Sequence, residues 1–148
     1  LMSDGEHDEG NTWEAILLAG KQKLHNLTAI VDRNNIQIDG YTEDIMPLEP
    51  LADKWSAFNW HVIEVDGHNF EALNAAFGEA RAIFEKQTVI IAHTIPGKGV
   101  SFAEGDFHWH GDPLGKKDVA GDPPKAEQVK IALNELRTLG GKIKSEHN

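Results

Sequence analysis

Residues 27–35 read LTAIVDRNN and predict a buried strand that ends in a polar turn. The run from Leu27 to Asp32 is apolar on both faces of a strand, which is typical of a parallel sheet covered by helices on both sides. Charged and amide side chains follow it, ending with the pair Asn34-Asn35. In open α/β sheets, ligands bind beyond the carboxyl ends of the strands. This stretch therefore predicts both the class of fold and the edge where a site should lie.

A second strand end lies at the start of the sequence, which opens LMSDGEHDEG. The first two residues resemble the end of a buried strand, and a turn through Asp4 and Gly5 follows. A helix predicted over residues 11–25 joins this stub to the strand described above. If the two strands are neighbours, Asp4 and Asn34 lie side by side. A carboxylate and an amide oxygen, together with a backbone carbonyl, form a hard-oxygen site that suits Mg²⁺ or Ca²⁺.

The rest of the chain alternates helices and strands and predicts an α/β fold with a parallel sheet. Further helices are predicted over 50–59, 69–86 and 124–139, and further strands over 60–66 and 88–95. Residues 34–40 and 96–124 predict loops, and residues 140–148 a frayed tail. Since only three full strands and a stub are visible, we expect the chain to be part of a larger domain or to need a partner.

The long helix over residues 69–86 is predicted to be amphipathic and to be capped by Asn69. Its expected apolar face consists of Phe70, Leu73, Ala76, Phe77, Ala80 and Phe84.

The overall composition excludes several classes of protein. The chain has 148 residues, 40% of them hydrophobic, a formal net charge of -10 and no cysteine. This charge argues against nucleic acid or an anionic membrane as the main partner. The absence of cysteine excludes disulfides and thiolate zinc sites and is compatible with a cytoplasmic protein. No apolar run approaches the roughly 20 residues of a membrane span.

Three other interpretations of the polar segments fail. An EF-hand counted from Asp4 would need Gly at its sixth position and Glu at its twelfth, but the sequence has Glu9 and Ala15 there. The Gly-Lys-Gly at 97–99 lacks the spacing of a Walker A motif. The pair His108 and His110 has no other soft ligand nearby, which argues against zinc. An ordinary acidic turn remains the plain alternative for the opening stretch.

The pattern S3-D4-G5 followed by N34-N35 looks like the thiamine-diphosphate-binding motif, usually written G-D-G, a gap, then N-N or N-G. Four longer segments of the sequence resemble the transketolase family: EGNTWEAILLAGKQKLHNLTAIVDRNNIQIDG, LADKWSAFNWHVIEVDGHNF, AHTIPGKGVSF and HWHGDPLG. The similarity is closest to the N-terminal section of the split transketolases. It implies that residues 1–115 are the C-terminal portion of the diphosphate-binding domain, lacking its first part, and that residues 116–148 are a loop, terminal helix and tail.

The resemblance implies a role for each matching residue. Asp4, the Asn34 side chain and the backbone carbonyl of Ile36 would hold Mg²⁺, or Ca²⁺ or Mn²⁺ in its place. Gly5 and Asn34 would contact the diphosphate of the cofactor. His110, in H-G-x-P-L-G, would reach the diphosphate and the sugar substrate as a catalytic residue. Glu9 would join a carboxylate network across a dimer interface.

The sequence departs from the family pattern at two places. Ser3 replaces the first glycine of the motif, and Pro96 stiffens the turn after the strand over 88–95. The glutamate that protonates the cofactor's aminopyrimidine ring belongs to the family's C-terminal section, so no residue here is assigned that role.

The resemblance predicts part of an enzyme that transfers a two-carbon ketol unit between sugar phosphates. Its expected partner is a transketolase C-terminal section, in a homodimer or heterotetramer. The alternatives are a deoxyxylulose-phosphate synthase, a 2-oxo acid dehydrogenase component, or a catalytically silent assembly module.

Overall fold

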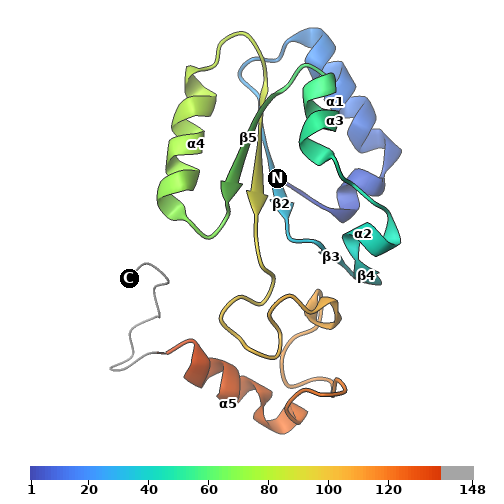
Figure 1. The fold of residues 1–148 in the computed structure, drawn as a ribbon, viewed down its shortest axis with the longest axis vertical. Coiled ribbons are helices and arrows are strands. Elements are labelled where there is room, and N and C mark those ends of the chain that lie inside the picture. Colours follow the sequence, from blue (N-terminus) through green and yellow to red (C-terminus); the bar gives the residue numbers. More distant parts are fainter. Residues whose placement is uncertain (138–148) are drawn as a thin grey trace.

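The computed structural model describes residues 1–137, and its centre is a four-stranded parallel sheet (Figure 1). The strands lie in the order β1 (Met2–Ser3), β2 (Thr28–Arg33), β6 (Thr88–His93), β5 (His61–Asp66). In the pairing of β1 with β2, Ser3 stands opposite Asp32. The α/β fold is therefore confirmed, and the opening stub and the strand over 27–32 are neighbours, which was the condition for Asp4 and Asn34 to lie at the same edge.

Helices cover both faces of this sheet, as predicted. Helices α1 (Gly10–Gln22) and α3 (Leu51–Ala57) lie on one face, and α4 (Phe70–Ala82) lies on the other (Figure 1). The larger core lies under α1 and α3 and consists of Ile16, Ala19, Ala29, Val31, Leu51, Trp55, Trp60, Val89 and Ile91. The smaller core under α4 consists of Ala76, Ala80 and Ile90. Trp55 and Trp60 are both buried in the larger core, and Trp13 packs against it partly buried.

The apolar face of α4 is only partly as predicted. Asn69 caps the helix, since its side chain accepts hydrogen bonds from the backbone N–H of Glu71 and of Ala72, both at 3.0 Å. However, Phe70 is 84% exposed and Phe84 is 76% exposed, so their assignment to the core was wrong. The helix ends at Ala82, which takes Phe84 out of the helical period, and small alanines form its buried contact with the sheet.

The segment after β2 is more regular than the predicted loop. It contains a short antiparallel pair, β3 (Ile36–Gln37) and β4 (Gly40–Tyr41), followed by the one-turn helix α2 (Thr42–Ile45). Two-residue strands are too short for an alternating pattern to reveal them. This hairpin stands at the carboxyl edge of the main sheet, directly beyond the end of β2 (Figure 1).

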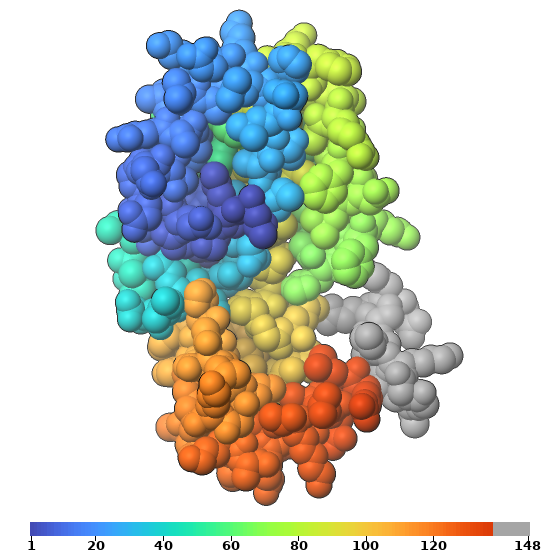
Figure 2. Space-filling view, turned by 180° about the vertical axis from the view of Figure 1, so that it is seen from behind, coloured from blue at the N-terminus to red at the C-terminus, as the bar shows by residue number. Residues whose placement is uncertain are grey.

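The chain beyond β6 forms a packed unit of its own, coloured orange to red in the lower part of the molecule (Figure 2). A long loop includes the short helix η2 (Phe107–Trp109) and leads into α5 (Lys125–Glu135). The buried residues of this unit are Val100, Ala103 and Ala132, with Phe102, Trp109 and Leu114 packed against them. The predicted long ordered loop is thus confirmed, and the predicted tail over 140–148 lies outside the described residues. Within residues 1–137, no helix combines the length and the apolar content needed to cross a membrane.

Candidate functional site

Asp4 is the most completely enclosed charged side chain at the carboxyl edge of the sheet. It follows β1 directly and is 0% exposed. Its Oδ2 accepts three hydrogen bonds, from Arg33 Nη1 at 2.7 Å, Asn35 N at 2.7 Å and Thr42 Oγ1 at 2.9 Å. Its Oδ1 is also buried, and within residues 1–137 it has no hydrogen-bond partner. A buried oxygen of a carboxylate without a partner indicates a place for an ion or a water molecule.

Arg33 supplies the positive charge beside Asp4. It is 2% exposed at the end of β2, and its other nitrogens bind two acidic residues of the following segment. Nη2 lies 2.7 Å from Glu43 Oε1 and 2.9 Å from Glu49 Oε1. Burial disfavours the charged guanidinium, but the hydrogen bonds and charges of Glu49, Asp4 and Glu43 outweigh burial and hold the pKa of Arg33 above its usual value. The guanidinium is therefore a permanent charge in this site.

Asn34 is oriented by a second set of contacts. Its Nδ2 donates to Asp32 Oδ2 at 3.1 Å, and its Oδ1 accepts from Ile36 N at 3.0 Å. The other oxygen of Asp32 accepts a hydrogen bond from the hydroxyl of Thr94, which follows β6. The next residue, Asn35, has a φ of 66°, a left-handed conformation that asparagine tolerates better than most residues. This turn directs the backbone N–H of Asn35 onto Asp4.

Gly5 and Ile36, the two residues predicted to act through their backbone, lie in the short elements that follow β1 and β2. Ile36 is buried in β3. Gly5 begins the short helix η1 (Gly5–Asp8), and a Cβ atom there would first meet the Gln37 side chain, at 3.8 Å. A Cβ atom at Gly5 would therefore fit in ordinary contact with Gln37, so the packing of the protein itself does not require glycine at this position.

Neither His110 nor Glu9 is among the residues that contact Asp4. His110 follows η2 and is exposed, and within residues 1–137 its side chain makes no hydrogen bond. The short helix η2 stands on the same side of the sheet as the hairpin, because Phe107 contacts Tyr41 of β4 at 5.3 Å between ring centres. Glu9 is the exposed residue before α1, and its side chain makes no capping bond.

Arg33 and Thr42 both bind Asp4, although the sequence did not predict either of them as a member of this site. Arg33 continues the inward-facing positions Ala29 and Val31 of β2, where an apolar residue is expected. A charged residue at such a position needs a buried partner, and this signal could have identified Asp4 as that partner. Thr42 gives no comparable signal, because its contact with Asp4 depends on the hairpin that follows β2.

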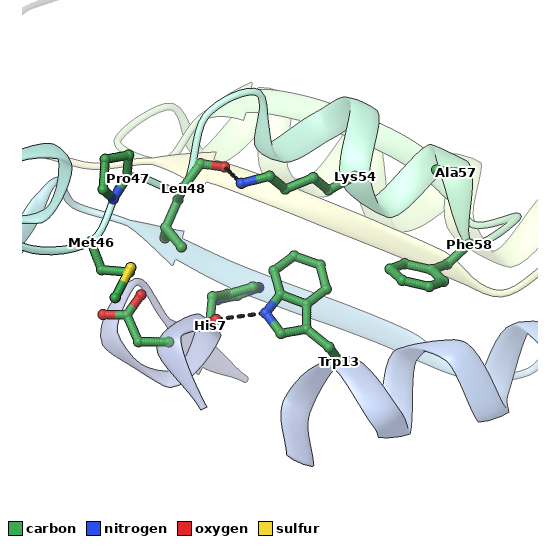
Figure 3. Close-up of a pocket in the computed structure, with 9 residues that line it drawn as sticks. His7, Trp13, Met46, Pro47, Leu48, Lys54, Ala57 and Phe58 are labelled. Atoms are coloured by element: carbon green, nitrogen blue, oxygen red, sulfur yellow. Dashed lines mark hydrogen bonds between the residues drawn. The ribbon is translucent and has the colours of Figure 1, made fainter. Parts of the chain in front are cut away.

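A separate cavity of about 560 Å³ opens between the start of α1 and α3 (Figure 3). His7, Trp13, Met46 and Phe58 are among its lining residues, and Lys54 spans part of it to reach the carbonyl oxygen of Leu48 at 2.7 Å. None of the predicted site residues lines this cavity. It is mainly apolar and differs in character from the edge around Asp4.

The oxygen atoms at this edge of the sheet are suitable ligands for a hard divalent cation. A carboxylate oxygen without a partner, a side-chain amide and backbone carbonyls are ligands that Mg²⁺ and Ca²⁺ prefer. Within residues 1–137, no group of three or more His, Cys, Asp or Glu side chains is placed to hold a metal. A metal here would therefore need amide, backbone and external ligands, such as phosphate oxygens, to complete its coordination.

Comparison with known proteins identifies the family. Residues 1–126 match the family described as transketolase, thiamine diphosphate binding domain. The chain belongs to the transketolase family, and the matched region is this cofactor-binding domain.

Individual relatives agree with this assignment. The chain is 49% identical over 110 residues to the 6-deoxy-6-sulfo-D-fructose transketolase subunit SqwG of Clostridium sp. (strain MSTE9), covering 74% of this chain and 40% of that relative. It is 39% identical over 148 residues to an apulose-4-phosphate transketolase subunit of Phocaeicola vulgatus, covering 100% of this chain and 49% of that relative. The chain thus spans less than half of the length of these two relatives.

The fold also matches a solved transketolase. The structure of the transketolase from Pichia stipitis in complex with sedoheptulose-7-phosphate superimposes with a TM-score of 0.73 at 32% identity. The match covers 90% of this chain and 18% of that chain.

Proposed function

We propose that this chain forms the metal- and diphosphate-binding part of a transketolase. In the assembled enzyme, Asp4, the Asn34 side chain and the carbonyl of Ile36 hold a divalent cation, Mg²⁺ or in its place Ca²⁺ or Mn²⁺. Gly5 and Asn34 contact the diphosphate. The observation that carries the proposal is the buried Oδ1 of Asp4, which has no partner although its neighbour Oδ2 has three.

The reaction we propose for the assembled enzyme is transfer of a two-carbon ketol unit between sugar phosphates. Thiamine diphosphate, when bound, supplies the carbanion chemistry of this transfer. The residues of this chain bind and orient the cofactor, and the exposed side chain of His110 is free to reach the diphosphate and the sugar. The two relatives are named for different sugars, so the donor should be tested across a panel of ketoses and their phosphates.

The assembly we propose pairs this chain with a transketolase C-terminal section. Both relatives are named as subunits, which supports a separate partner chain, in a homodimer or heterotetramer. Glu9 is exposed at the start of α1 and can take part in a carboxylate network between the chains. We propose a cytoplasmic location.

Binding of thiamine diphosphate in the presence of Mg²⁺ tests the metal assignment. Calorimetric titration of the assembled enzyme should give a dissociation constant that rises at least about tenfold in Asp4→Ala, because the variant lacks the free oxygen. Asp4→Asn keeps the shape of the side chain but not its charge, and should weaken binding in the same direction. Asp44→Ala is the matched control, since Asp44 is exposed in α2.

The assignment would be abandoned if both variants of Asp4 bound the cofactor as tightly as the Asp44→Ala control. Circular dichroism of each variant would establish that the fold is retained. Activity with a ketose phosphate donor, against pyruvate, separates the proposed transketolase from other thiamine enzymes.

A further inference from the structure

The two oxygens of Asp4 differ in the hydrogen bonds they accept, and this difference affects which metal ion the site should prefer. All three hydrogen-bond donors converge on Oδ2, at 2.7, 2.7 and 2.9 Å, and none reaches Oδ1. An ionised carboxylate offers about four lone-pair sites over its two oxygens. Oδ2 therefore has no remaining capacity for a metal ion, and Oδ1 has all of its own.

Arg33 is the donor that cannot turn away from Oδ2. Its guanidinium is held on the opposite side by Glu49, through Nε at 3.2 Å and Nη2 at 2.9 Å, and by Glu43 at 2.7 Å from Nη2. Glu49 is fixed in turn by the backbone N–H of Leu51, at 2.9 Å from its Oε2. A planar guanidinium held at several points keeps one orientation.

We propose that Arg33 is a positioning residue that reserves Oδ2 of Asp4 and limits Asp4 to one metal-binding oxygen, which favours Mg²⁺ over Ca²⁺ in this site. This inference rests on the proposed function, which places the metal at Asp4. Ca²⁺ takes six to eight oxygen ligands and often binds both oxygens of a carboxylate, whereas Mg²⁺ keeps an octahedral shell and does not need the second oxygen. Removing Arg33 takes away the only charged donor of Oδ2 and leaves the two neutral ones, Asn35 N and Thr42 Oγ1. Oδ2 then becomes more available to a cation, and the two-oxygen contact that suits Ca²⁺ becomes easier to form.

Thr42 supports the same oxygen but carries no charge. Its hydroxyl lies 2.9 Å from Oδ2 and is buried with it. Loss of this hydroxyl should free Oδ2 partly and shift metal preference in the same direction as loss of Arg33, to a smaller extent. Glu49→Gln is the control variant, because it removes one negative charge near Arg33 while Glu43 and Asp4 still hold the guanidinium in place.

The test measures metal preference by cofactor binding in the assembled enzyme. The dissociation constant of thiamine diphosphate is determined by calorimetry with saturating Mg²⁺ and with saturating Ca²⁺, and the ratio of the two constants is compared between variants. We expect Arg33→Met to move this ratio toward Ca²⁺ by about tenfold, in the range seen for residues that orient metal ligands. Thr42→Val should move it less, and Glu49→Gln should leave it unchanged.

An unchanged ratio in Arg33→Met, or an equal change in Glu49→Gln, would overturn the inference. If Arg33→Met does not fold, Thr42→Val decides, and an unchanged ratio there overturns it. The proposed function fails separately, if Asp4→Asn retains full metal-dependent binding. A loss of binding in Asp4→Asn together with an unchanged ratio in Arg33→Met would leave the metal site standing and remove only the role of Arg33.

Discussion

His7 is a titratable side chain enclosed by aromatic rings. It is 2% exposed, and its ring lies 5.5 Å from that of Trp13 and 5.7 Å from that of Trp55, between ring centres. Its Nδ1 donates to the carbonyl oxygen of Ser3 at 2.8 Å, while the buried Nε2 has no hydrogen-bond partner among the described residues. Burial lowers the pKa of His7 below its ordinary value, more than the Ser3 hydrogen bond and the nearby acidic residues raise it. Burial therefore favours the neutral imidazole in the folded protein at pH 7.

Protonation of His7 should destabilise the fold. In the unfolded chain its pKa is about 6.5, so below that pH the unfolded state binds more protons than the folded state. The free energy of unfolding is expected to fall as pH decreases from about 7 through 6.5 and below. In His7→Leu this part of the pH dependence should disappear, as measured by urea unfolding at a series of pH values.

His110→Leu is the control for this prediction, because His110 is exposed. It should keep the wild-type pH dependence. If His7→Leu showed the same loss of stability toward acid as wild type, the neutral buried state of His7 would not be the cause.

At the scale of the element, α4 illustrates how one side chain begins a helix. Asn69 satisfies two of the backbone N–H groups that the first turn leaves without a partner. The helix then presents two buried alanines, Ala76 and Ala80, to the sheet, and Phe77 packs beside them.

Asn69→Ala should lower the free energy of unfolding by about 1 kcal/mol, the usual effect of losing an asparagine cap. Chemical denaturation would measure the change. Asn74→Ala makes the same substitution at an exposed position inside α4, where alanine favours the helix. Equal destabilisation by both variants would show that the capping bonds are not responsible.

At the scale of the whole molecule, the chain has two packed units with different kinds of stabilisation. The sheet unit has apolar cores on both faces, whereas the unit beyond β6 has a small core and relies on buried polar contacts. Gln128 of α5 is 0% exposed and binds three backbone groups of the preceding loop. It accepts from Gly115 N at 2.8 Å and donates to the carbonyl oxygens of Lys117 and Pro123, each at 3.0 Å.

Gln128→Leu should open the loop over residues 115–123 without affecting the sheet. The substitution leaves three backbone groups without their partner, and each such loss is worth about 1–3 kcal/mol when the group stays buried. Hydrogen exchange followed by mass spectrometry should show faster exchange in this loop and unchanged protection of β6. Gln22→Leu, at an exposed position in α1, is the matched control. Faster exchange throughout the molecule would contradict the division into two units.

The sequence by itself determined the order of elements, the parallel sheet and the cap at Asn69. These features follow from local periodicity and turn chemistry, which are properties of neighbouring residues. The transketolase motif also stands in the sequence, at Asp4, Gly5 and Asn34.

Only the tertiary structure decided that Oδ1 of Asp4 stays free, because the donors to Oδ2 come from residues 29, 31 and 38 positions away along the chain. It likewise decided that Phe70 and Phe84 face solvent, since helix length and the close approach of α4 to the sheet are set by packing. Contacts between distant segments have no local pattern, so the partners of Asp4 became visible only when the sheet edge, the hairpin and α2 were brought together.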